Sequence, residues 1–282
     1  MNRYLLDIQN GNANCNAGFK APADVVSILR NNGWTVESVR TDLPLFRSVF
    51  YFLGKMFSFF FKVERHSDIL VQYPVYSEKG NGFFQIIRLL LKLKNIRFIG
   101  LVHDVRYMRG LGNPVKQEIK ELNLFDTVIV HSFRMKDALQ KQGCISELKL
   151  LGLFDYPVEK TNKEIRQSGF DVCYVGNLSN RSFISNLGKL TEDSSLEIEL
   201  YGFPELCPSS ERVHYRGGFQ PSDVSSIKGS WGLVWDGDSL ESPQGVNAEY
   251  QKFNSPHKAS LYVVAEMPLI VHSSAAIASV VK

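Results

Sequence analysis

The sequence has none of the short motifs that mark the commonest phosphate, hydrolase and metal sites. It contains no GxxxxGK[ST] phosphate loop, no GxSxG, no HExxH and no GxGxxG. The glycine-bearing stretch from Gly11 to Gly18 lacks the spacing of a dinucleotide-binding loop. These absences argue against P-loop nucleotide hydrolysis, serine hydrolysis and zinc-dependent proteolysis. They also argue against a nucleotide-sugar epimerase or dehydrogenase.

Cysteine and net charge are both scarce. The cysteines Cys15, Cys144, Cys173 and Cys207 form no CxxC pair, so they predict free thiols of a reducing compartment rather than a disulfide framework or a zinc site. With 32 basic and 29 acidic side chains the net charge is only +3, which does not require a nucleic-acid partner. The first residues, MNRYLLDIQNGN, lack a long apolar core, so we expect no signal peptide and a cytoplasmic protein.

Long apolar runs are few, and the densest one carries charge. Residues 45–63 (LFRSVFYFLGKMFSFFFKV) are rich in phenylalanine, but Arg47, Lys55 and Lys62 interrupt them, which argues against a membrane span. The segment predicts a buried helix that also lines an interface between subunits, and hence a homo-oligomer. A helix lying on the inner face of the membrane, as a peripheral contact, is the alternative.

The chain does contain two runs of alternating strand-like and helix-like segments. The first run predicts strands at 4–8, 35–39, 68–73, 96–103, 127–131 and 148–153, and helices at 23–32, 83–94, 115–122 and 133–142. The second predicts strands at 171–175, 196–201, 213–215, 231–235 and 269–272, and helices at 182–190, 221–228, after 255 and at 274–281. Apolar strands separated by helices predict parallel sheets covered on both faces.

A polar segment that contains Pro157 separates the two runs. We therefore predict an α/β fold with an N-terminal domain over 1–155, a linker over 156–169 and a C-terminal domain over 170–282. Two doubly wound domains joined in this way place a cleft between the carboxyl ends of their sheets, where such folds bind ligands.

The segment 252–271 (KFNSPHKASLYVVAEMPLIV) holds the most specific chemistry. Asn254 or Ser255 can cap a helix, and Pro256 suits its first turn. The first-turn amides, the helix dipole and the ammonium group of Lys258 would then converge on one point, which is a geometry that binds phosphate. An ordinary capped helix with a solvent-facing lysine is the alternative for this segment alone.

Several segments together resemble one family of two-domain glycosyltransferases. The segments YVGNLSNRSFI, YRGGF, LVWDGDSL and FNSPHKASLYVVAEMPLIV resemble GT-B enzymes related to bacterial β-galactofuranosyltransferases and to the glucosyltransferases that glycosylate serine-rich streptococcal adhesins. Upstream, NAGFKAPADV, ILVQYPVY, LVHDVRYMR, VIVHSFRMKDAL and LFDYPV follow in matching order. The resemblance implies two Rossmann-like domains facing each other across a cleft, with a UDP-sugar bound by the C-terminal domain.

The resemblance also implies where the donor is held. Most of the positions lie at strand ends and helix starts of the C-terminal half, and the others lie in one N-terminal loop. The predicted donor-binding residues are Asn16, Lys20, Gly176, Asn177, Arg181, Tyr215, Asp236, His257, Lys258, Ala259 and Ser260.

Roles for these residues follow from the same resemblance. Lys258 and the amides of Ala259 and Ser260 correspond to the contact with the pyrophosphate. The Gly176-Asn177 turn with Arg181 corresponds to a second phosphate or ribose contact, and Tyr215 to an aromatic residue near the uracil. Residues 16–20 correspond to a loop that reaches across the cleft toward the donor.

Two polar positions near Lys258 leave alternatives open. Asp236-Gly237-Asp238 is a DxD sequence, which binds a metal in glycosyltransferases of a different fold, but here it follows a strand of a two-domain pattern. We expect no metal there, and expect Asp236 or Asp238 to bond sugar hydroxyls. His257 either contacts donor hydroxyls or is a capping or core histidine.

Sugar transfer needs a stabilised leaving group and, with inversion, a general base. Lysine and helix-start amides aimed at the pyrophosphate can do the first without a metal, so we expect no cofactor besides the UDP-sugar substrate. Candidates for the base follow predicted N-terminal strands: Asp104 beside His103, and His131. A loop aspartate that caps the next turn is the alternative for Asp104. Tyr73 and Arg109 are then predicted to contact the acceptor.

Two features depart from the family pattern. Glu266-Met267 stands where Gly-Leu is expected, so we expect Glu266 to cap the preceding helix differently or to stay helical. The chain ends at Lys282, where family members continue with a further strand and helices. The sequence predicts an enzyme that moves galactofuranose or glucose from a UDP-sugar, with inversion and without a metal, to a surface polysaccharide or glycoprotein acceptor. The alternative is a non-catalytic subunit or sugar-binding module of the same fold.

Overall fold

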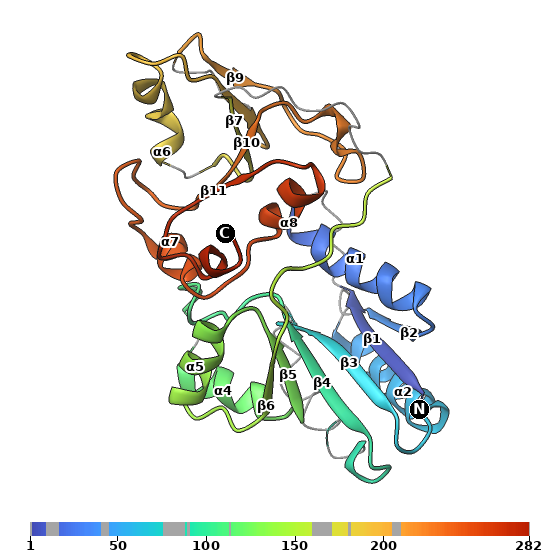
Figure 1. Cartoon of the computed structure of the whole chain (residues 1–282). Coiled ribbons are helices and arrows are strands. Elements are labelled where there is room, and N and C mark those ends of the chain that lie inside the picture. Colours follow the sequence, from blue (N-terminus) through green and yellow to red (C-terminus); the bar gives the residue numbers. More distant parts are fainter. Residues whose placement is uncertain are drawn as a thin grey trace. The chain divides into compact units, whose positions relative to one another are not determined.

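The computed structural model divides into two compact units, Met1–Leu151 and Gly152–Lys282, called here the N-terminal and C-terminal domains. It describes residues 2–9, 17–40, 45–75, 88, 91–112, 114–159, 171–179, 182–204 and 210–281. Most of the predicted linker and most of the predicted helix 83–94 lie outside these ranges. Each domain is built on its own all-parallel sheet, which confirms the predicted α/β architecture (Figure 1).

The N-terminal domain holds a six-stranded sheet in the order β2-β1-β3-β4-β5-β6. Its strands are β1 (Arg3–Gln9), β2 (Thr35–Arg40), β3 (Asp68–Tyr73), β4 (Arg97–Val102), β5 (Thr127–Val130) and β6 (Glu147–Leu150). Its helices are α1 (Ala17–Asn31), α2 (Leu45–Lys62), α4 (Val115–Leu122) and α5 (Phe133–Lys141). β3 and β4 are buried along nearly their whole length, as expected for strands covered on both faces.

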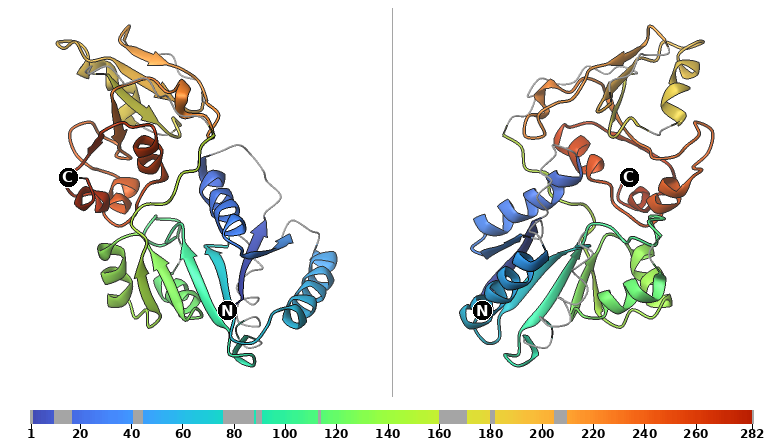
Figure 2. Two further views of the ribbon diagram at one scale, coloured as in Figure 1. Left: turned by 45° about the vertical axis from the view of Figure 1, so that its right-hand side comes forward. Right: turned by 180° about the vertical axis from the view of Figure 1, so that it is seen from behind.

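The C-terminal domain holds a five-stranded sheet in the order β11-β10-β7-β8-β9. The strands are β7 (Val172–Val175), β8 (Ile198–Tyr201), β9 (Val213–Tyr215), β10 (Trp231–Val234) and β11 (Leu269–Val271). The helices are α6 (Ser182–Ser185), α7 (Val246–Gln251) and α8 (His257–Val264), with 3-10 turns η1 (Leu187–Leu190), η2 (Val224–Ser226) and η3 (Ala276–Ser279). From β7 the chain first builds outward through β8 and β9, then returns to place β10 on the other side (Figure 2). This reversal between β7 and β10 is the topological switch point of the sheet.

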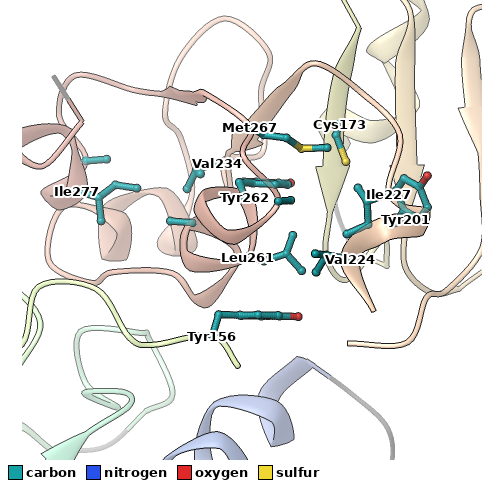
Figure 3. Packing of buried hydrophobic residues seen from close by; sticks show 13 residues of the cluster. Tyr156, Cys173, Tyr201, Val224, Ile227, Val234, Leu261, Tyr262, Met267 and Ile277 are labelled. Carbon is teal, nitrogen blue, oxygen red and sulfur yellow. The ribbon is translucent and has the colours of Figure 1, made fainter. Parts of the chain in front are cut away.

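A buried cluster fixes α8 against the switch point (Figure 3). Tyr262 of α8 is fully buried and packs with Leu261, Met267 and Cys173 in this cluster. Gly232 of β10 allows the close approach, because a Cβ atom there would lie 2.3 Å from the Tyr262 ring. The packing therefore sets where the first turn of α8 stands relative to the ends of β7 and β10.

Helix α8 ends in a left-handed residue, and that residue is Glu266, with a φ of 57°. The amide of Met267 donates to the carbonyl of Tyr262 at 2.9 Å. The amide of Glu266 donates to the carbonyl of Val263 at 3.0 Å. These are the two bonds of a Schellman motif. The prediction that Glu266 caps differently or stays helical is wrong, because these bonds and the burial of Met267 hold it in the conformation that glycine usually adopts.

Helix α2 matches the predicted segment closely but is not fully buried. Phe57 is 68% exposed and Phe61 is 66% exposed, and their rings form an edge-to-face pair at 4.7 Å. Phe59 on the same helix is buried against Tyr4 of β1. Within the part of the chain that the structure describes, no helix has both the length and the apolar content to cross a bilayer.

Several predicted boundaries differ from the observed ones. Helix α1 begins at Ala17 rather than at residue 23, with Pro22 inside it. The predicted helices 182–190, 221–228 and 274–281 are present only as α6 and the 3-10 turns η1, η2 and η3. These segments are short, and local helix propensity is a weak determinant over so few residues. Helix α7 was not predicted.

Candidate active site

The ammonium group of Lys258 lies at the switch point of the C-terminal sheet. Its Nζ atom donates to the carbonyl of Trp235 at 3.2 Å and to Oδ1 of Asp236 at 3.0 Å, both just beyond the end of β10. It also lies 4.6 Å from the ring centroid of Tyr174 in β7, a cation–π distance. Lys258 and Asp236 are only 13% and 16% exposed. The solvent-facing alternative for Lys258 is therefore wrong.

Three residues that contact Lys258 or follow it closely in the chain carry buried polar atoms without a partner in the part of the chain that is described. The hydroxyl of Tyr174, the indole Nε1 of Trp235 and the hydroxyl of Ser260 are buried and have no hydrogen-bond partner among the described residues. The Tyr174 hydroxyl lies 3.1 Å from the ideal Cβ position of Gly176, so it connects the predicted Gly176 turn to Lys258. Buried polar groups without partners are rare and concentrate where a ligand or ordered water completes them.

The start of α8 differs in detail from the prediction. Pro256 is the N-cap residue, so neither Asn254 nor Ser255 caps the helix with its side chain. The amide of Ala259 donates to the carbonyl of Pro256 at 2.9 Å, and that of Ser260 is the first of the regular helical ladder. The predicted contact of these two amides with a phosphate is wrong, because both are used within the helix. The open end of α8 belongs to earlier residues.

The ring of His257 faces a different neighbourhood from Lys258. It lies 4.9 Å from the ring of Tyr156 and 6.1 Å from that of Phe154, between ring centroids. His257 is itself partly exposed, and its two aromatic neighbours are buried. The contact of His257 with donor hydroxyls stays a prediction.

The remaining predicted donor residues are spread over the carboxyl edge of the sheet. Asn177 Oδ1 accepts from the amide and the hydroxyl of Ser179 at 2.9 and 2.7 Å, so the side chain shapes the turn after β7. The hydroxyl of Tyr215 donates to the carbonyl of Gly202 at 3.0 Å, at the β9 edge of the sheet. Arg181 lies outside the described residues. Among the described residues, Gly176 and Lys258 lie against Tyr174, and Asp236 joins them through its bond to Lys258.

The two aspartates of the DxD sequence have different surroundings. Asp236 Oδ2 accepts from Nε2 of Gln251 at 3.1 Å while its Oδ1 accepts from Lys258. The carboxylate of Asp238 lies against Gly245, where a Cβ atom would be 2.0 Å from Oδ2. Within the described ranges, no three His, Cys, Asp or Glu side chains gather as a metal site.

The predicted N-terminal donor loop is only partly described. Asn16 lies outside the described residues, and Lys20 belongs to the first turns of α1 rather than to a loop. Nζ of Lys20 donates to both carboxylate oxygens of Asp24 at 2.7 Å. The placement of Lys20 in a loop is therefore wrong, and its contact with a donor stays a prediction.

In the N-terminal domain, the candidate base stands at the carboxyl end of β4. Oδ2 of Asp104 accepts from Arg109 at 2.6 Å, with Asp104 19% and Arg109 42% exposed. Nε2 of His103 lies 2.7 Å from Oε1 of Gln72 in β3. The structure thus joins Asp104 to Arg109, one of the two predicted acceptor residues.

Tyr73 has a different environment from the predicted one. It is 2% exposed, and its hydroxyl lies 3.0 Å from a carboxylate oxygen of both Glu118 and Glu121 and accepts from Arg106 at 2.9 Å. The two carboxylates also pair with Arg106. The prediction that Tyr73 stacks on an acceptor sugar is wrong, because the ring is in the core beside Phe125.

Glu118 supports the loop after β4, a role that no sequence pattern predicted. Glu118 is fully buried in α4, and its carboxylate accepts from the amides of Arg106 and Tyr107 at 2.8 Å each. A single carboxylate therefore holds the backbone between Asp104 and Arg109. A glutamate in an amphipathic helix is normally a surface residue, and only this loop contact distinguishes it.

His131 is a structural residue. It is 3% exposed, and its Nε2 atom lies 2.8 Å from the carbonyl of Val102. Burial lowers its pKa, although the bond to Val102 opposes that shift. The candidate role of His131 as a base is wrong, because its ring is enclosed between β4 and β5.

Two Rossmann-like domains, one with a largely buried lysine at the start of a helix beside its switch point, fit a glycosyltransferase of the GT-B class. The chain belongs to the glucosyltransferase 3-like family. Residues 3–153 match the glucosyltransferase 3-like N-terminal domain, and residues 172–282 match the C-terminal domain of the same family.

Two characterised relatives support this assignment. The beta-1,6-galactofuranosyltransferase WbbI of Escherichia coli (strain K12) is 29% identical over 273 residues, which cover 93% of this chain and 77% of the relative. Glucosyltransferase 3 of Streptococcus gordonii is 25% identical over 216 residues, which cover 74% of this chain and 61% of the relative. Both relatives are glycosyltransferases, and the chain is accordingly an enzyme that transfers a glycosyl group.

Proposed function

We propose that the chain transfers a hexose, galactofuranose or glucose, from a UDP-sugar to the carbohydrate of a surface polysaccharide or glycoprotein. The observation that carries this proposal is the Lys258 ammonium group at the switch point, bounded by the buried and unpartnered Tyr174 hydroxyl. Parallel sheets bind nucleotides at such points. The choice of sugars rests on the names of the two relatives.

Lys258 would act on the leaving group. As the bond between the sugar and UDP breaks, negative charge grows on the terminal phosphate, and a fixed ammonium group stabilises that charge without reorganising. A lysine in this position supplies the stabilisation that a metal ion provides in other enzymes. We therefore propose metal-independent transfer with no cofactor.

Asp104 would act on the acceptor. An ionised carboxylate can take the proton of the attacking hydroxyl, and inversion requires one such base. The guanidinium group of Arg109, 2.6 Å from Oδ2, places a positive charge beside Asp104 and orients its carboxylate. His103 would support the same strand end through Gln72 rather than act on the sugar.

The donor site is tested by calorimetric titration of UDP with and without EDTA. We expect metal-independent binding to the wild type and its loss in Lys258→Ala. Lys252→Ala is the matched control, because Lys252 carries the same charge nearby but pairs with Glu249 at 2.7 Å. Absence of UDP binding to folded wild type, or equal losses in both variants, would refute the proposed site.

Turnover separates the enzyme from a non-catalytic relative. We expect slow release of free sugar from UDP-glucose or UDP-galactofuranose by the wild type, detected as UDP formed in the absence of an acceptor. With an acceptor oligosaccharide identified by screening, Asp104→Asn should reduce transfer by about 100-fold or more. A protein that binds UDP but turns over neither donor would favour the alternative of a sugar-binding module.

The exposed face of α2 is a candidate surface for self-association. We propose that Phe57 and Phe61 form part of an interface with a second copy of the chain, because two large aromatic side chains lie open side by side. Light scattering of wild type and Phe57→Ser/Phe61→Ser tests this, with loss of a dimer or larger assembly expected. Flotation with anionic vesicles tests the alternative of a membrane-surface contact.

A further inference from the structure

The ammonium group of Lys258 already has an anionic partner within its own chain. Oδ1 of Asp236 lies 3.0 Å from Nζ, at ion-pair distance. A diphosphate that binds Lys258 therefore meets a lysine whose charge is partly neutralised. This arrangement differs from a phosphate-binding lysine that is surrounded only by neutral groups.

The carboxylate of Asp236 is held from two sides. Its Oδ1 atom accepts from Lys258, and its Oδ2 atom accepts from Nε2 of Gln251 at 3.1 Å. Gln251 is itself 4% exposed in α7, so its amide group is fixed by packing. These two bonds hold the Asp236 carboxylate beside the ammonium group.

Geometry then sets the distance between the two anions. A phosphate oxygen at hydrogen-bond distance from Nζ would lie about 5 Å from Oδ1 of Asp236, given ordinary angles at the ammonium group. Like charges at that distance in a partly buried site repel each other appreciably. The repulsion grows with the charge on the phosphate that lies next to Lys258.

We infer that Asp236 competes with the donor diphosphate for Lys258 and thereby makes the site prefer a UDP-sugar over UDP. The terminal phosphate of UDP is a monoester with a second pKa near 6, so above that pH it carries about one more negative charge than the same phosphate in a UDP-sugar. The repulsion from Asp236 is therefore larger for the product than for the substrate. Asp236 speeds product release at some cost in donor affinity.

This inference rests on the proposed donor site, and the experiment keeps the two apart. UDP and UDP-glucose are titrated at pH 8 into wild type, Lys258→Ala, Asp236→Asn and Glu241→Gln. Glu241 lies exposed on the same loop, so its substitution controls for the loss of one negative charge. If wild type fails to bind UDP, or Lys258→Ala binds as well as wild type, the donor site itself is refuted.

Given a working donor site, Asp236→Asn should tighten UDP binding about tenfold and UDP-glucose binding about threefold, with Glu241→Gln unchanged. The preference for the UDP-sugar should shrink accordingly. Weaker binding of both ligands by Asp236→Asn would show that Asp236 only aims Lys258, and would overturn the inference. Weaker binding of UDP-glucose with unchanged UDP binding would show a contact with sugar hydroxyls, and would also overturn it.

Asp236→Ser gives a second removal of the carboxylate, with a shorter side chain. It should change the ratio of the two affinities in the same direction as Asp236→Asn. Thermal unfolding of each variant shows whether it is folded. A folded Asp236→Ser variant that keeps the wild-type ratio of UDP to UDP-glucose affinity would contradict the inference. That holds even if Asp236→Asn could not be purified.

Discussion

The hydroxyl of Tyr262 accepts a hydrogen bond from the amide of Val175 at 2.8 Å and so ties α8 to the end of β7. The same hydroxyl lies 3.3 Å from the carbonyl of Leu233 in β10 and donates to it. One side chain of α8, the helix that carries Lys258, thus joins both strands of the switch point. The position of Lys258 is set by this buried contact as much as by its own bonds.

Removing the Tyr262 hydroxyl should destabilise the C-terminal domain. Tyr262→Phe leaves the amide of Val175 and the carbonyl of Leu233 without this partner, and we expect a loss of about 2 kcal/mol in the free energy of unfolding. Tyr174→Phe is the control, because that hydroxyl has no partner in the described part of the chain, and its loss should be neutral or stabilising. Chemical denaturation measures both, and equal losses would contradict this account.

Gly232 should tolerate no side chain. A Cβ atom would lie 2.3 Å from the Tyr262 ring, so Gly232→Ala forces α8 away from β10. We expect a loss of about 3 kcal/mol, together with weaker UDP binding through displacement of Lys258. Gly54→Ala in α2 meets no atom within 4 Å and should stabilise that helix by about 0.5 kcal/mol. Unfolding curves of similar midpoint for the two variants would refute the prediction.

Replacing Glu266 by glycine should stabilise the protein. Glu266 holds a φ of 57°, which costs a residue with a side chain about 1 kcal/mol relative to glycine. We therefore expect Glu266→Gly to raise the free energy of unfolding by about that amount, less the extra freedom glycine gains when unfolded. Glu266→Ala keeps the unfavourable conformation and should give no gain. If Glu266→Ala is also stabilising, removal of the Glu266 charge rather than relief of the backbone conformation is the cause.

Glu118 and Glu121 offer a test of what holds the loop after β4. Both carboxylates contact Tyr73 and Arg106, but only Glu118 accepts from the loop amides of Arg106 and Tyr107. Glu118→Gln should destabilise the N-terminal domain by about 2 kcal/mol and speed hydrogen exchange at those two amides. Glu121→Gln should leave their exchange slow. The same exchange rates in both variants would argue against the assigned role.

Stability should fall as the pH drops because His131 is buried as the neutral form. Burial lowers its pKa below the ordinary value of 6.5, so at lower pH the unfolded chain binds a proton that the folded chain excludes. The contribution of His131 to the free energy of unfolding is complete above pH 6.5. It is lost progressively as the pH falls from there toward the pKa of His131 in the folded chain. His131→Gln should flatten the dependence in denaturation between pH 7 and about pH 5. If the free energy of unfolding of His131→Gln depends on pH as steeply as that of the wild type, His131 is not the source of the dependence.

Strands were the most predictable part of the fold. Runs such as DILVQY and TVIV are short, apolar and bounded by polar or proline residues, so β3 matches its prediction exactly in extent and β5 differs by one residue. Short helical segments were predicted poorly. Residues 274–281 look helical, yet tertiary context leaves only the turn η3, because local propensity is a weak determinant over so few residues.

Site residues were predictable where their sequence neighbours mark them. They were not predictable where their role depends on contacts between segments far apart in the chain. Lys258 stands out through its place after Pro256, and Asp236 through its place after a strand. Tyr174 and Gln251 carry no such mark, because their roles arise from which strands become neighbours at the switch point. The role of Glu118 likewise depends on the folding of α4 against a loop that lies eleven or twelve residues before it in the chain.

The enclosure of Lys258 also bears on water. With its side chain 13% exposed and its ammonium group in contact with a carbonyl, a carboxylate and an aromatic ring, Nζ has already lost most of its hydration shell. Desolvation of an ammonium ion is ordinarily a large part of the cost of binding an anion. Here folding covers part of that cost in advance, because Lys258 is already largely withdrawn from solvent. The dehydration of Lys258 should therefore contribute less to the heat of UDP binding than the dehydration of an exposed lysine would.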